Sequence, residues 1–118
     1  MPGTGKSFTI CVLIEALLRL QKKVLITCYT HVALDLIIDR FMVMYPQHKH
    51  KIVRMTSSTQ DSSQKVKDIT FQRQNLNNLE EVDEFVDKKF LYFTTALSTS
   101  DPILQSIKFD YVICDESS

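Results

Sequence analysis

The sequence predicts an α/β fold in which a parallel β-sheet is flanked by helices. A glycine-rich loop, residues 1–7, runs directly into an apolar helical segment. Short apolar segments then alternate with helical patterns along the chain, and each apolar segment is followed by polar side chains. This alternation is typical of parallel sheets, whose ligands bind beyond the carboxyl ends of the strands.

The loop has the composition of a phosphate-binding loop, and both glycines of the chain lie in it. Glycine lets the backbone approach an anion closely, and N–H groups at the start of a helix point toward it. We expect Gly3, Thr4 and Gly5 to surround the phosphates of a nucleoside triphosphate. Lys6 is expected to reach the β- and γ-phosphates, and the Ser7 hydroxyl to bind Mg²⁺.

The full phosphate-loop pattern has a further glycine, which would fall one position before Met1. We therefore expect Met1 to be an internal loop residue and the strand before the loop, the first strand of such a sheet, to be missing. The 118 residues are at most one domain.

Composition limits the function classes. The formal net charge is zero, with 14 basic and 14 acidic side chains, so any nucleic-acid contact must be local. No apolar run approaches the ~20 residues that cross a bilayer, so we expect no membrane association. The three cysteines lie in apolar runs without metal-ligand spacing, which predicts buried, reduced cysteines in an intracellular protein.

The remaining elements follow from periodicity, caps and breakers. An apolar segment at residues 8–20 predicts a buried helix, and His48 and His50 are assigned to a solvated turn. Residues 57–77 are polar and predict a surface excursion, after which Asn78 is positioned to cap a helix. The predicted helices are residues 8–20, 32–45, 78–89 and 101–107. The predicted strands are residues 24–28, 51–56, 90–95 and 109–116.

The last predicted strand delivers two carboxylates, Asp115 and Glu116. Adjacent carboxylates at the end of a buried strand are costly unless they meet cations, and nucleotide-bound Mg²⁺ is such a cation. Asp115 is therefore expected to bind Mg²⁺ together with Ser7. Glu116 is expected to orient and deprotonate the attacking water, which makes Lys6 and Glu116 the candidate catalytic residues. Taken alone, the pair could equally begin a surface turn.

These motifs, with Tyr29-Thr30-His31 and Thr94-Thr95, resemble the first RecA-like motor domain of superfamily 1 helicases. Within them the chain is most similar to the DNA replication ATP-dependent helicase/nuclease family. The resemblance implies a P-loop NTPase fold, ATP and Mg²⁺ as cofactors, 5′-to-3′ movement on single-stranded DNA and a nuclear location. It implies that strand contacts to phosphates come from Thr30, His31, Thr94 and Thr95, for which the alternative is ordinary polar strand ends.

The chain also departs from that family. Ser117 and Ser118 follow the carboxylate pair, where family members usually have a small residue and then a glutamine. We expect residues 1–118 to be part of a first motor domain, with the second motor domain as a partner elsewhere in the full-length chain. The isolated 118-residue chain is then expected to be nearly inactive and prone to aggregate. No residue here can be assigned to a nuclease.

Three other interpretations stay open. An RNA helicase of the same superfamily would share every motif. A ring-forming P-loop ATPase would share the loop at residues 2–7. The non-enzymatic interpretation is a nucleotide-binding remnant without catalysis.

Overall fold

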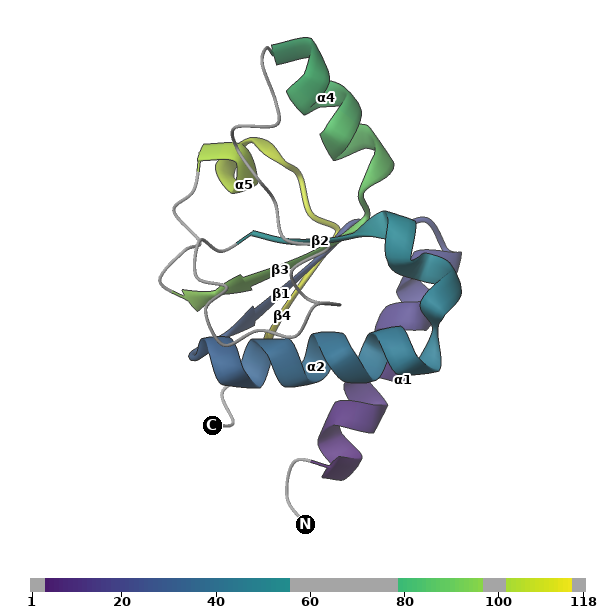
Figure 1. Ribbon diagram of the computed structural model, residues 1–118. Coiled ribbons are helices and arrows are strands. Elements are labelled where there is room, and N and C mark those ends of the chain that lie inside the picture. The colour runs from purple at the N-terminus through teal and green to yellow at the C-terminus, as the bar shows by residue number, and fades with distance from the viewer. Residues whose placement is uncertain (1–3, 56–78, 97–101, 116–118) are drawn as a thin grey trace.

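A computed structural model describes residues 4–55, 79–96 and 102–115 (Figure 1). The predicted excursion at 57–77 and the Asn78 cap lie outside these residues. The helices are α1 (Thr4–Arg19), α2 (His31–Met44), the 3₁₀ helix η1 (Pro46–Lys51), α4 (Leu79–Lys88) and α5 (Pro102–Ser106). The strands are β1 (Val24–Cys28), β2 (Ile52–Arg54), β3 (Leu91–Thr95) and β4 (Tyr111–Asp115). None of the helices described is long and apolar enough to cross a membrane.

The four strands form one parallel sheet in the order β2-β3-β1-β4. β1 therefore pairs on one side with β3, from Val24 opposite Leu91 to Cys28 opposite Thr95. On its other side β1 pairs with β4. The predicted α/β fold with flanking helices is confirmed, and its strands end at one edge of the sheet. We call this the carboxyl edge, formed by the strand ends Cys28, Arg54, Thr95 and Asp115 and by Tyr29, Met55 and Ala96, which follow the first three.

Helices cover both faces of the sheet (Figure 1). α1 and α2 pack on one face, where Ile14, Leu34 and Phe41 join alternate side chains of the strands in the larger core cluster. On the other face Leu25 and Tyr92 pack with Leu104 of α5 and Phe85 of α4. Successive strand residues point to opposite faces, so β1 and β3 are buried along their whole length, as the sequence predicted.

Two backbone hydrogen bonds form the turn between α1 and β1. Gln21 has a φ of 58°, its N–H donates to the Leu18 carbonyl at 3.0 Å, and the Lys22 N–H donates to the Leu17 carbonyl at 3.1 Å. These paired bonds are a Schellman cap, which usually has glycine at the left-handed position. The cap ends α1 and turns the chain directly into β1.

The prediction that the first helix is buried all round is wrong. Ile10, Ile14 and Leu18 are buried, but Phe8 and Leu13 on the other side of α1 are about half exposed. Among the described residues, one side of α1 packs on α2 and β1. Hydrophobicity could not decide between the two sides of this helix, because both are apolar.

The predicted burial of the last strand and of all three cysteines is also wrong in part. β4 is the outer strand of the described sheet, and Tyr111 and Val112 are about half exposed. Cys114 is exposed with them, whereas Cys11 and Cys28 are buried. Burial raises the pKa of the Cys11 thiol to about 11, which makes it unreactive near neutral pH.

His48 was predicted to lie in a solvated turn, but its side chain packs on the core. Its ring stacks on Phe41 with 6.3 Å between ring centroids. Its Nε2 lies 3.5 Å from Oε1 of Glu15, which also accepts a 2.6 Å hydrogen bond from Arg19. Glu15 thereby links α1 to η1. Burial alone would raise the pKa of Glu15, but the hydrogen bonds from Arg19 and His48 outweigh it and lower the pKa below its usual value.

Replacing Glu15 by glutamine is expected to lower the free energy of unfolding by about 1 kcal/mol at neutral pH, because hydrogen bonds to a charged group are lost. A lowered folded-state pKa stabilises the fold above the usual value of 4.5 and loses that stabilisation as the pH falls below it. The difference in unfolding temperature between the protein and Glu15→Gln should therefore shrink below about pH 4.5. A difference that stays constant from pH 7 to pH 3.5 would contradict this assignment.

Candidate functional site

The strand pairing places three residues in one row at the carboxyl edge. Cys28 is opposite Thr95 on one side and opposite Asp115 on the other. Residues paired in a parallel ladder point to the same face, and Cys28 belongs to the core cluster beneath α1 and α2. Thr95 and Asp115 therefore lie on the face that α1 and α2 cover.

The phosphate-loop residues lead directly into α1. α1 begins at Thr4, so Gly5, Lys6 and Ser7 belong to its first turn. The first four N–H groups of a helix have no acceptor within the helix and carry partial positive charge. This backbone arrangement is suited to an anion. Gly3 and the side chains of Lys6 and Ser7 lie outside the described part of the structure.

Asp115 ends β4 and is buried, with 6% of its surface exposed. A carboxylate removed from water at a strand end has the donor chemistry that Mg²⁺ prefers. Within the described residues no three histidine, cysteine, aspartate or glutamate side chains gather as a metal site. The other predicted metal ligand, Ser7, and the predicted base, Glu116, have no described side chain. The Asp115 carboxylate fits one ligand position of Mg²⁺.

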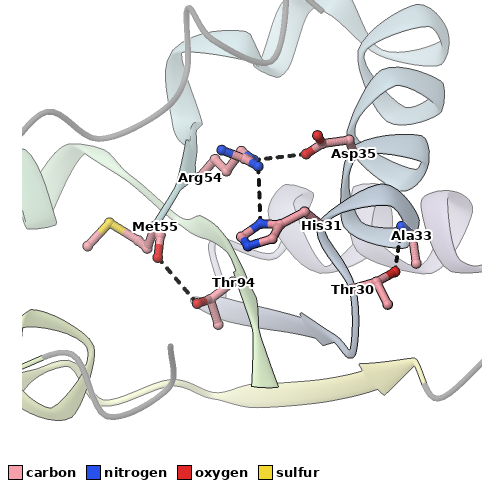
Figure 2. Close-up of polar contacts among 7 residues, drawn as sticks. All are labelled: Thr30, His31, Ala33, Asp35, Arg54, Met55 and Thr94. Atoms are coloured by element: carbon pink, nitrogen blue, oxygen red, sulfur yellow. Dashed lines mark hydrogen bonds and ion pairs between the residues drawn. The ribbon is translucent and has the colours of Figure 1, made fainter. Parts of the chain in front are cut away.

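Thr30 caps α2 just beyond the end of β1. Its backbone is extended, with φ −124° and ψ 155°, and its hydroxyl accepts a 3.1 Å hydrogen bond from the Ala33 N–H (Figure 2). Thr30 is exposed. Its hydroxyl hydrogen is not used by the cap, so the same side chain can donate to a ligand at the start of the helix.

His31, the first residue of α2, is held by a buried arginine. Nη2 of Arg54 lies 3.4 Å from Nδ1 of His31, and Nε of Arg54 donates to Oδ1 of Asp35 at 2.8 Å (Figure 2). The Arg54 side chain is 0% exposed, and that of Asp35 is 17% exposed. Arg54 ends β2 and points to the face that α2 covers, so the contact ties that strand end to α2.

The two predicted threonines on β3 point to opposite faces. Thr94 is fully buried, and its hydroxyl donates to the Met55 carbonyl at 3.3 Å (Figure 2). Thr95 is also buried, in the row with Cys28 and Asp115. Neither threonine is as exposed to a ligand as Thr30, and Thr94 links the end of β3 to Met55 directly after β2.

Arg54 and Asp35 were missed by the sequence interpretation. Arg54 lies within the strand predicted at residues 51–56 and Asp35 within the helix predicted at residues 32–45, and neither was given a role. Two signals were present. Arg54 follows Ile52 by two positions, the spacing of one strand face, and Asp35 follows His31 by one helical turn.

Comparison with known sequence families bears on these motifs. A family described as AAA domain matches residues 1–85. The chain belongs to the AAA domain family. In this AAA domain the matched part runs from the phosphate loop through β2 and into α4, so it includes the start of α2 and Arg54.

Relatives of this AAA domain carry the name DNA replication ATP-dependent helicase/nuclease. The one from Xenopus laevis is 30% identical over 121 residues, which cover 100% of this chain and 11% of that protein. The one from Schizosaccharomyces pombe is 31% identical over 126 residues, covering 100% of this chain and 8% of that protein. The human relative is 30% identical over 122 residues, which cover 100% of this chain and 11% of that protein.

The predicted resemblance to helicase motor domains is thus confirmed, and the chain is a helicase-family motor domain of the P-loop type. It spans about a tenth of the length of these relatives, 11% in Xenopus laevis and in human.

Proposed function

We propose that the intact protein is an ATP-dependent helicase that moves 5′-to-3′ on single-stranded DNA in the nucleus, and that this chain forms part of its first motor domain. The relatives named above, which are ATP-dependent DNA replication enzymes by name, support this class. The observation that carries the proposal is the pairing of Cys28 with Asp115. It places the acidic strand end beside the strand that leads into Thr30 and His31.

On the nucleotide side, the first-turn N–H groups of α1 and the Lys6 ammonium hold the phosphates of ATP. Ser7 and Asp115 hold Mg²⁺, and Glu116 accepts a proton from the attacking water. Bound Mg²⁺ supplies positive charge to the phosphate oxygens. Burial of Asp115 strengthens its attraction for that charge, because water screens the pair less than at the surface.

On the DNA side, the start of α2 holds a phosphate of the strand. The Ala33 and Leu34 N–H groups donate to Thr30. The earlier N–H groups of the helix, the Thr30 hydroxyl and the His31 imidazole are the donors for a ligand at this helix end, where the dipole favours an anion. Contacts of this kind position a strand without reading its bases, and they suit a chain with zero net charge. Thr94 supports this track, because its hydroxyl joins the end of β3 to Met55 directly after β2.

The nucleotide site and the DNA contacts can be coupled through β1. Its terminal residue Cys28 is in register with Asp115, and Thr30 follows it by two positions. A shift of Asp115 when ATP is hydrolysed would therefore be passed through one strand end to the DNA contacts. The second motor domain, and with it most of the activity, is proposed to lie elsewhere in the full-length chain, so the 118-residue chain alone should hydrolyse ATP poorly.

Strand separation by the intact protein tests direction and substrate together. The substrates are a duplex with a 5′ single-stranded tail, the same duplex with a 3′ tail, and a duplex with a 5′ RNA tail. We expect ATP-dependent unwinding of the 5′ DNA-tailed duplex. Unwinding only from the 3′ tail would contradict the direction, and a preference for the RNA tail would favour the RNA helicase interpretation.

A further inference from the structure

Arg54 is a charged side chain with no exposed surface, and it is placed where it contacts the start of α2. Burying a guanidinium is costly unless its charge is balanced and its N–H groups are bonded. Asp35 supplies the charge through Nε of Arg54, at 2.8 Å. The contact with His31 uses Nη2, which lies on the same edge of the planar guanidinium group as the Nε–H. One edge of the arginine therefore engages two residues that lie one turn apart on α2.

The contact also sets which nitrogen of His31 carries the proton. Arginine has five N–H donors and no acceptor. The 3.4 Å contact is therefore a hydrogen bond only if Nδ1 of His31 accepts. A ring whose Nδ1 accepts is neutral and carries its proton on Nε2. Figure 2 shows the second ring nitrogen of His31 on the side of the ring away from Arg54.

We propose that Arg54 is a positioning residue for DNA binding, which fixes the His31 ring so that its Nε2–H is presented to a phosphate of the bound strand. Asp35 holds Arg54 in place, and of these three residues only His31 touches the DNA. This inference rests on the proposed function, because it requires that the start of α2 holds a DNA phosphate. It adds that His31 acts as a neutral donor and that a residue of β2 controls it.

The affinity of the intact protein for single-stranded DNA tests whether Arg54 acts through His31. His31→Ala is expected to weaken the affinity about threefold to tenfold, the loss of one neutral hydrogen bond. Arg54→Lys keeps the charge but cannot bond Asp35 and His31 along one rigid edge, so it should cause a similar loss. In the double variant the second change should add nothing, because both act through one contact. Arg40→Lys, on the exposed side of α2, is the matched control and should bind like the unchanged protein.

The salt dependence of DNA binding tests whether His31 is neutral when it contacts the phosphate. A neutral His31 releases no counterion, so His31→Ala should leave the slope of log affinity against log salt concentration unchanged. If His31 were charged, the same variant would show a slope shallower by about 0.7, because one released counterion would be lost. His31→Gln, which keeps an acceptor and a donor, should recover part of the lost affinity.

The outcomes separate this inference from the proposed function. If the intact protein binds DNA but Arg54→Lys binds normally, or the two losses add, the positioning role is wrong while the function stands. A shallower salt slope for His31→Ala shows that His31 is not a neutral donor, and this test does not need the Arg54 variant. Loss of affinity for a non-hydrolysable ATP analogue would reveal that Arg54→Lys has failed to fold. Failure of the unchanged protein to bind single-stranded DNA overturns the proposed function itself.

Discussion

Replacing Glu116 by glutamine in the intact protein is expected to lower the rate of ATP hydrolysis about 10²- to 10⁴-fold, the usual contribution of a general base. Glutamine has the size of glutamate but cannot accept the proton of the attacking water. It leaves the phosphate loop and Asp115 unchanged, so the affinity for ATP should stay close to that of the unchanged protein. Single-turnover hydrolysis and equilibrium binding of a fluorescent ATP analogue measure the two quantities separately.

Asp115→Asn is the informative companion to that variant. It removes the charge that we assign to Mg²⁺, so it should raise the Mg²⁺ concentration needed for half-maximal hydrolysis, whereas Glu116→Gln should not. Hydrolysis by Glu116→Gln within about threefold of the normal rate would show that another group accepts the proton, since a general base is worth at least about 10²-fold.

Replacing Lys6 by alanine is expected to weaken ATP binding about 10- to 100-fold and to abolish hydrolysis. The expected loss is that of one charge-assisted hydrogen bond, which contributes about 1.5–3 kcal/mol, or about 10- to 100-fold in affinity. In the transition state more charge gathers on the phosphate oxygens, so the loss in rate should exceed the loss in affinity. Titration with the same fluorescent analogue and a steady-state hydrolysis assay give both numbers.

Lys108→Ala is the matched control for the lysine change. Lys108 is exposed and precedes β4, so it lies at the opposite end of that strand from Asp115. Its removal should alter neither binding nor hydrolysis. If Lys6→Ala bound and hydrolysed ATP like Lys108→Ala, the loop at residues 1–7 would not be the phosphate site.

Sequence reasoning worked where a local pattern decides the structure. The apolar, partly β-branched run at Val24–Cys28 could only be buried on both faces as a short strand, and β1 has those bounds. Pro46 stopped the second helix as expected, since α2 ends at Met44. The family match over residues 1–85 spans the predicted phosphate loop, and the phosphate-binding role of that loop stays a prediction.

The features that were missed depend on contacts between distant parts of the chain. Arg54 and His31 are 23 positions apart, and only the sheet order and the packing of α2 bring them together. The same holds for Glu15 and His48, which are 33 positions apart. The exposed side of α1 could not be found for a different reason: hydrophobic periodicity shows which face of a helix is buried only when the other face is polar.

The central claim is that the phosphate loop and the start of α2 belong to one motor, in which ATP hydrolysis depends on a bound strand. The direct measurement is the steady-state rate of ATP hydrolysis by the intact protein as single-stranded DNA is added. The account predicts a rate that rises to a plateau with DNA, with a higher half-saturating DNA concentration for His31→Ala than for Arg40→Lys. A Glu116-dependent rate that is the same with and without DNA would contradict it.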